Sequence, residues 1–161
     1  MQRHTPRQVF TNPVYFFAYG FGTGLSPWAP GTTGTLAGVA LYMLLWPVTY
    51  WQYLIVTLTL FIAGIFVCGY TAARLGVEDP AAVNWDEVAG YLITMAFAPR
   101  GLAWMALGFV LFRLFDIVKP WPIRWFDRNL KGGLGIMLDD LVAAIFAGVC
   151  LYIGVFIWTR A

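Results

Sequence analysis

The chain contains no Asp, Glu, Lys or Arg between Arg7 and Arg74. Only 11% of its 161 residues are charged and 60% are hydrophobic, whereas soluble domains average about 25% and about 45–50%. A water-soluble fold cannot cover its surface with so few charges, so the sequence predicts an integral membrane protein. The same composition excludes a disordered chain, and a net charge of +2 gives no basis for nucleic-acid binding.

Five apolar stretches predict membrane helices. They cover residues 36–46, 50–73, 88–98, 102–115 and 141–158. The second and the last are long enough to cross a bilayer. The first and third would each rise only about 16 Å as helix, so we expect them to continue into polar sequence or to be re-entrant. We therefore expect an all-α, polytopic membrane bundle of four to five apolar helices, forming a single domain over residues 1–161.

The distribution of Lys and Arg predicts the orientation, because cytoplasmic loops carry the excess of positive charge. If the N-terminus is cytoplasmic and every stretch crosses, eight basic residues fall on the cytoplasmic side: Arg3, Arg7, Arg74, Arg113, Lys119, Arg124, Arg128 and Lys131. Only Arg100 and Arg160 fall on the far side. Three polar segments, 20–35, 78–87 and 113–140, then converge on the cytoplasmic face, and the last two hold all eight carboxylates.

Segment 20–35 is rich in glycine and precedes an apolar helix. Glycines permit close backbone approach, and a helix N-terminus offers free N–H groups to an anion. A phosphate cradle is one interpretation; a tightly packed turn between membrane helices is the other. The segment is not a P-loop, because no GK[ST] follows it.

Two further segments supply carboxylates. Asp86 is expected to cap the helix of stretch 88–98, and capping does not require the neighbouring Glu87. Asp139 and Asp140 are expected to lie directly before the last stretch. With Asp116, these acids form a set of hard oxygen ligands that suits Mg²⁺. A surface patch in which acids and bases neutralise each other is the alternative.

The chain's histidine and cysteines limit other chemistry. Its one histidine, His4, lies near the N-terminus, which argues against Ser-His-Asp catalysis. Cys68 and Cys150 lie in apolar runs, so neither a disulfide nor a zinc site is expected.

Taken together, the polar segments resemble the phosphatidylglycerophosphatase A family. The resemblance covers roughly residues 14–155 and rests on four blocks: 22–34, Trp85-Asp86-Glu87 with Gly90, 113–129 around Lys119-Pro120-Trp121-Pro122, and Gly132-Gly133-Leu134-Gly135 through Asp140. Thr35 stands where the family pattern has a serine. The resemblance implies a Mg²⁺-dependent, multi-pass enzyme of the bacterial inner membrane, active at the cytoplasmic face. It would hydrolyse phosphatidylglycerophosphate to phosphatidylglycerol and inorganic phosphate.

On this interpretation the site residues have three roles. Glu87, Asp116, Asp139 and Asp140 would hold the metal, and Asp116, Asp86 and Asp140 would take part in catalysis through Mg²⁺-activated water or an aspartyl nucleophile. The substrate would be bound by six residues: Arg113, Lys119, Arg124, Arg128, Thr32 and Thr33.

Three alternatives remain outside this interpretation. A CDP-alcohol phosphotransferase is disfavoured because its D-G-x2-A-R pattern is absent. The others are a transporter and a lipid-binding subunit, although a transporter would place its charges near the bilayer midplane.

Overall fold

The computed structural model describes residues 3–160, and these residues form helices and no strand. Met1, Gln2 and Ala161, which the expected 1–161 domain includes, lie outside the described residues. The helices are α1 (Pro6–Thr11), α2 (Pro13–Ala18), η1 (Thr23–Leu25), α3 (Pro30–Leu44), α4 (Tyr50–Leu75), α5 (Trp85–Met95), α6 (Leu102–Val118), α7 (Ile123–Asn129) and α8 (Gly132–Trp158). The all-α prediction is confirmed.

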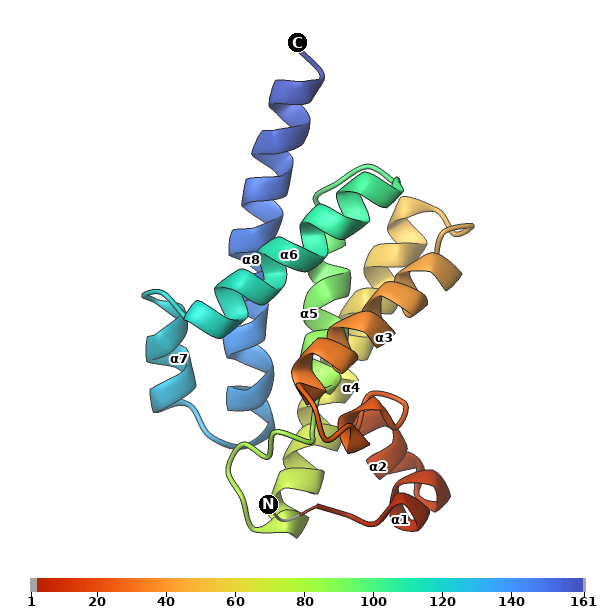
Figure 1. Cartoon of the computed structure of the whole chain (residues 1–161), viewed down its shortest axis with the longest axis vertical. Helices are drawn as coiled ribbons and strands as arrows, with labels where there is room; N and C mark the ends of the chain where they lie inside the picture. Colours follow the sequence, from red (N-terminus) through yellow and green to blue (C-terminus); the bar gives the residue numbers. More distant parts are fainter. Residues whose placement is uncertain (1–2, 161) are drawn as a thin grey trace.

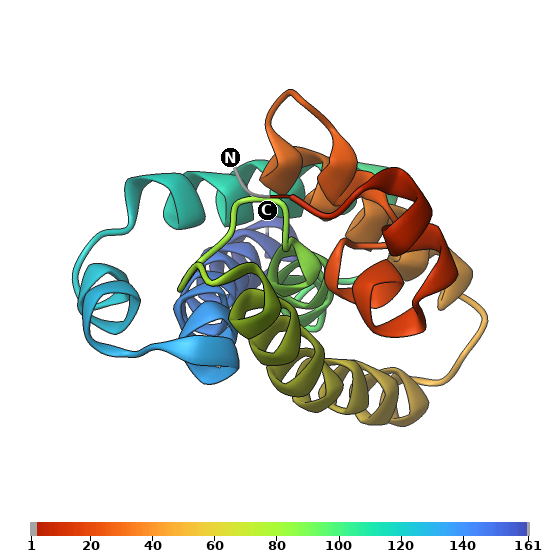
Figure 2. The same ribbon diagram turned by 90° about the horizontal axis from the view of Figure 1, so that it is seen from below.

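The short helix α5 forms the centre of the molecule, where α3, α4, α6 and α8 all pack against it (Figures 1 and 2). Most of its side chains are buried, including Trp85, Val88, Tyr91 and Leu92. Beyond its first turn α5 is apolar on almost all sides, and such a helix is stable only when other helices surround it. This position carries the acidic first turn of α5 into the interior at one end of the bundle.

Local sequence signals explain where the longest helices begin and end. Thr49 and Gln52 form a capping box at the start of α4, and Gly76 closes that helix in the left-handed conformation with φ +67°. The turn at Pro99-Arg100-Gly101 separates α5 from α6, as its sequence predicts. At the other end of α6, Pro120 prevents the helix from continuing.

Two helices, α4 and α8, are long and apolar enough to cross a membrane, among the residues that the structure describes. The expected four to five spans are not confirmed. Helices α3 and α5 have 15 and 11 residues, so they rise only about 22 Å and about 16 Å, less than the hydrocarbon thickness of about 30 Å.

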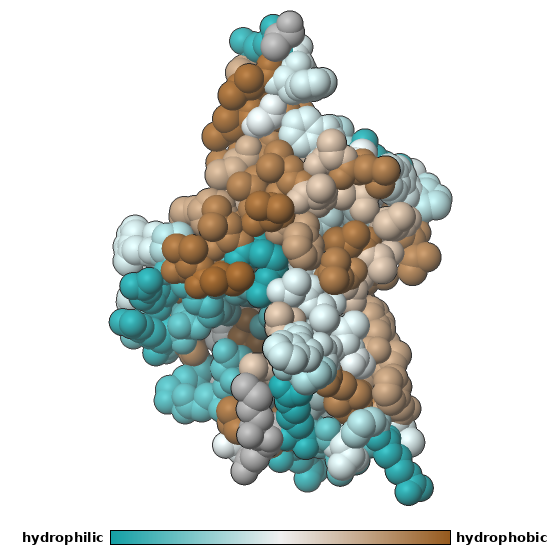
Figure 3. Space-filling view, viewed as in Figure 1, coloured by the Kyte–Doolittle hydropathy of each residue, from teal (hydrophilic) through white to brown (hydrophobic). Residues whose placement is uncertain are grey.

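Large apolar side chains cover the outside of the bundle. On α4, Trp51, Ile55, Leu58, Ile62 and Phe66 follow one another at helical spacing and are 47–74% exposed. The C-terminal half of α8 carries a similar surface, and Figure 3 shows hydrophobic residues over the upper part of the molecule and hydrophilic ones over the lower part. Apolar surface on this scale is typical of a protein that contacts lipid, and the polar end holds the acidic start of α5.

Candidate active site

The acidic pair on α5 lies in its first turn. The helix begins at Trp85 with Asn84 as its N-cap, so the prediction that Asp86 caps the helix was wrong. The buried Asn84 binds three other elements instead, α2, η1 and α3: its backbone N–H donates to the Ala18 carbonyl at 3.0 Å, and its amide donates to Thr23 Oγ1 at 3.0 Å and to the Pro30 carbonyl at 2.7 Å. Asn84 therefore fixes the start of α5 against the glycine-rich segment and α3.

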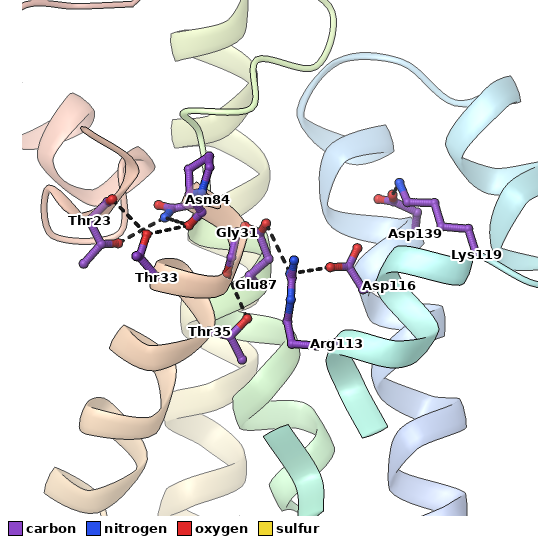
Figure 4. A network of polar contacts seen from close by, with 11 residues as sticks. Thr23, Gly31, Thr33, Thr35, Asn84, Glu87, Arg113, Asp116, Lys119 and Asp139 are labelled. Atoms are coloured by element: carbon purple, nitrogen blue, oxygen red, sulfur yellow. Dashed lines mark hydrogen bonds and ion pairs between the residues drawn. The ribbon is translucent and has the colours of Figure 1, made fainter. Parts of the chain in front are cut away.

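Arg113 and Asp116 lie near the end of α6 and face this acidic turn. They are three residues apart on one helix face, and the Arg113 guanidinium donates to Asp116. Arg113 Nη1 also lies 3.6 Å from Glu87 Oε1 (Figure 4). Arg113 thus joins the carboxylates of α5 and α6.

Asp139 and Asp140 lie inside α8, whose first residue is Gly132. The prediction that they directly precede the last helix was wrong, because α8 continues through the glycine-rich run before them. Asp140 is 3% exposed, and its carboxylate joins those of Asp86 and Glu87 in a cluster whose ligand oxygens all lie within 4.8 Å of one another.

Each member of this three-carboxylate cluster has a buried oxygen without a hydrogen-bond partner: Asp86 Oδ1, Glu87 Oε2 and Asp140 Oδ2. Unpaired buried polar atoms are costly, so several of them at one point indicate a missing partner. Clustered hard oxygens fit a divalent cation such as Mg²⁺. Three carboxylates would not fill the coordination shell of Mg²⁺, and the ion would keep waters at its other positions.

Burial and mutual repulsion perturb these acids. Burial raises the pKa of Glu87 to about 7, even though a hydrogen bond with Asp86 and the charge of Arg113 oppose the increase. The pKa of Asp86 is also well above its usual value, because of burial first and then the neighbouring charges of Glu87 and Asp140. Carboxyl groups that resist ionisation when buried together are common in functional sites.

Lys119 forms a second charged group beside the cluster. Its Nζ lies 2.6 Å from Asp139 Oδ2 and also contacts Asp127. Burial by itself would lower the pKa of Lys119, but the hydrogen bonds to these two carboxylates outweigh burial and raise it. Asp139 is therefore paired with a lysine and lies outside the three-carboxylate cluster.

A cavity of about 320 Å³ unites these groups. Its lining includes the carboxylates of the cluster with Asp116 and Asp139, the cations Arg113 and Lys119, and the start of α3. We call it the acid cavity. It is large enough for a phosphate group, and it presents both carboxylates for a cation and cations for an anion.

The glycine-rich segment contacts the acid cavity through α3. Residues 30–35 form the first turns of this helix, so the expected loop up to Thr35 was wrong in that part. Gly31 lines the cavity and packs so closely that a Cβ there would lie 2.2 Å from Glu87 Oε1. Thr33 donates to the carbonyls of Thr23 and Pro30, and neither Thr33 nor Thr32 lines the cavity.

Arg124 and Arg128 lie on α7, away from the acid cavity. With Trp121 and Trp125 they line a separate pocket of about 490 Å³. The structure thus places Arg113 and Lys119 with the acids in the acid cavity. The other two residues predicted to bind phosphate, Arg124 and Arg128, lie at the separate pocket on α7.

Sequence reasoning missed four residues of this region. Asn84 and Gly31 position the start of α5 and of α3, Asp127 pairs with Lys119, and Asp79 lines the acid cavity. Asp79 and Asp127 lie in the polar segments that the sequence predicts to converge, and this predicted convergence could have identified both residues. The contacts of Asn84 and Gly31 depend on packing between distant segments and left no signal in the local sequence.

Comparison with known proteins shows which family this chain is similar to. The family model described as phosphatidylglycerophosphatase A matches residues 16–155. A phosphatidylglycerophosphatase A of Escherichia coli K12 is 45% identical over 92% of this chain and 87% of its own length, and one of Haemophilus influenzae is 43% identical over 88% of each. A putative phosphatidylinositol-3-phosphatase of Bacteroides thetaiotaomicron is 38% identical over 82% of this chain and 87% of its own. No solved structure matches the chain.

Proposed function

The chain belongs to the phosphatidylglycerophosphatase A family, and on that premise we propose that it hydrolyses the phosphomonoester of phosphatidylglycerophosphate. The products are phosphatidylglycerol and inorganic phosphate. The observation that carries the proposal is the cluster of Asp86, Glu87 and Asp140 beside Arg113, because it offers a cation site and a phosphate-binding cation in one cavity.

Mg²⁺ is the cofactor of this proposal, held by Asp86, Glu87 and Asp140, with Asp116 in the same cavity. The three unpaired buried oxygens support this assignment. Bound Mg²⁺ neutralises phosphate charge and lowers the pKa of a coordinated water. Asp139, a predicted ligand, is assigned instead to holding Lys119, because its carboxylate pairs with that ammonium group.

The chain's own cations orient the phosphate. Arg113 reaches Glu87 and Asp116 from α6, and its guanidinium is placed to donate to phosphate oxygens as charge builds on them. Lys119 adds a second positive charge at the cavity wall. Two routes for the attack are consistent with this arrangement. In one, water attacks phosphorus and the glycerol oxygen leaves with a proton. In the other, the Asp116 carboxylate attacks phosphorus, the glycerol oxygen leaves with a proton, and water then hydrolyses the acyl phosphate.

We place the protein in the bacterial inner membrane as a multi-pass protein with its acid cavity at the cytoplasmic face. Two helices of spanning length and the exposed apolar surfaces of α4 and α8 support a membrane location. The excess of Lys and Arg at the polar end supports the orientation. The membrane lipid itself is then the source of substrate.

The test is phosphate release by the purified protein from phosphatidylglycerophosphate in mixed micelles, with Mg²⁺ and with chelator. We expect release that depends on Mg²⁺ and falls by about 100- to 1,000-fold in Glu87→Gln and Asp140→Asn. Arg160→Gln is the control, because Arg160 lies over the Phe156 ring beyond the far end of α8, and it should leave the rate unchanged. A folded, Mg²⁺-supplied protein that releases no phosphate would refute the proposal and favour a transporter or lipid-binding subunit.

A further inference from the structure

Arg124 and Arg128 differ from the other basic residues around the acid cavity. Arg113, Lys119 and Lys131 each form an ion pair with at least one carboxylate. Within residues 3–160, Arg124 and Arg128 form none; Arg124 has only a 3.4 Å hydrogen bond to the Val118 carbonyl. Both side chains are exposed on α7 and retain most of their N–H donors for an anion.

Arg128 lines both the pocket on α7 and a smaller cavity that shares lining residues with the acid cavity. A small cavity of about 120 Å³ shares Asp79 and Asp139 with the acid cavity, and Arg128 is part of its lining. Arg128 also lines the pocket of about 490 Å³ on α7. Shared lining residues thus link the acid cavity to the small cavity, and Arg128 links the small cavity to the pocket on α7.

The walls of the α7 pocket combine arginine with exposed aromatic residues. Trp121 is 81% exposed and Trp125 is 51% exposed, and both lie beside Arg124 and Arg128. Tryptophan favours the headgroup level of a bilayer, where one side of the ring is apolar and the other is wet. Guanidinium groups at that level recognise the phosphates of lipid headgroups.

We propose that Arg128, assisted by Arg124, binds the phosphodiester of the lipid substrate while the phosphomonoester occupies the acid cavity. The inference rests on the proposed function, whose substrate carries two phosphates joined through glycerol, of which only the terminal one is released. This second anion site makes the protein selective for lipids with two phosphates over phosphatidic acid, which has a phosphomonoester and no phosphodiester.

The test compares kcat/KM for phosphatidylglycerophosphate and for phosphatidic acid in nonionic micelles, for the wild type and Arg128→Gln. We expect the variant to lose about tenfold on phosphatidylglycerophosphate, mainly through KM, and to keep its rate on phosphatidic acid. Inhibition by phosphatidylglycerol, which retains the phosphodiester, should weaken by a similar factor. Arg128→Lys should restore part of the loss, and Arg124→Gln should show a smaller effect in the same direction.

Arg74→Gln is the matched control, because Arg74 lies at the same end of the molecule over the Tyr70 ring and lines none of the three spaces. An equal fall on both substrates would overturn the inference, because it would mean that Arg128 binds a neighbouring phospholipid or supports the fold. Unchanged selectivity in Arg128→Gln would also overturn it. Those results leave the proposed function intact, whereas a wild type that hydrolyses neither lipid refutes the function itself.

Discussion

Replacing Gly31 by alanine is predicted to damage the acid cavity while leaving the fold stable. A Cβ on Gly31 would lie 2.2 Å from Glu87 Oε1 and 3.0 Å from both terminal nitrogens of Arg113. Ordinary contacts begin near 3.4 Å, so the Glu87 carboxylate has to move by about 1 Å. That carboxylate is the end of a flexible side chain, and the fold can therefore accommodate the methyl group at small cost.

The cost to function is larger because Glu87 belongs to the three-carboxylate cluster. The carboxylates of the cluster would have to converge on one cation, and Mg²⁺ tolerates little departure from its preferred arrangement of oxygens. A displacement of about 1 Å at a reacting centre lowers rates by about 100-fold. We expect kcat/KM of Gly31→Ala to fall by about that factor and its affinity for Mn²⁺, used as a spectroscopic probe, to fall at least about tenfold.

The assay pairs micellar phosphate release and Mn²⁺ binding with thermal unfolding in detergent. Gly154→Ala is the control, because it is also a helical glycine and its Cβ would lie 3.6 Å from Trp104, an ordinary contact. Its activity and Mn²⁺ affinity should equal those of the wild type. If Gly31→Ala keeps wild-type activity and Mn²⁺ affinity while folded, the close approach of α3 to Glu87 does not position the cluster, and the reasoning fails.

Two further predictions concern stability. Gly133→Ala should lower the free energy of unfolding by more than about 2 kcal/mol and so lower the Tm, because its Cβ would lie 1.8 Å from the Ile65 carbonyl oxygen and 2.9 Å from Gly69 Cα, and backbone cannot move aside as a side chain can; a wild-type Tm would contradict this packing. Metal-free protein should lose stability as pH rises from 4.5 to about 7. Folding raises the pKa of Glu87 from 4.5 to about 7, so the folded state favours the protonated carboxyl group and is weakened as that group ionises. Saturating Mg²⁺ should reverse this trend by binding the ionised carboxylates, and a Tm in chelator that is constant or rises across this interval would contradict the assignment.

The helices themselves were largely predictable from local sequence. The capping residues of α4, the turn before α6 and Pro120 after it all act within a few residues, so the chain specifies them without help from distant segments. The three-residue spacing of Arg113 and Asp116 is likewise a local property that places them on one helix face, and the two residues do contact each other.

The start of α8 was not predictable in this way. Gly132-Gly133-Leu134-Gly135 has the composition of a turn, yet all four residues are helical. Gly133 and Gly135 are needed because α8 passes so close to Ile65 of α4 and to Leu130 that a Cβ would collide with backbone. Packing between helices thus outweighed glycine's low helix propensity and placed Asp140 within the bundle.

The sequence by itself determined that this chain is helical and apolar, and that it holds an unusual set of acids and bases in a few polar segments, because composition and short-range spacing are properties of the chain alone. Only the tertiary structure decided which acids meet. Asp86 and Glu87 meet Asp140, although they lie more than fifty residues before it in the chain. Asp139, the direct neighbour of Asp140 in the chain, forms an ion pair with Lys119 instead. Adjacent residues on a helix point about 100° apart, so the packing of α5, α6 and α8 divided this pair between two partners.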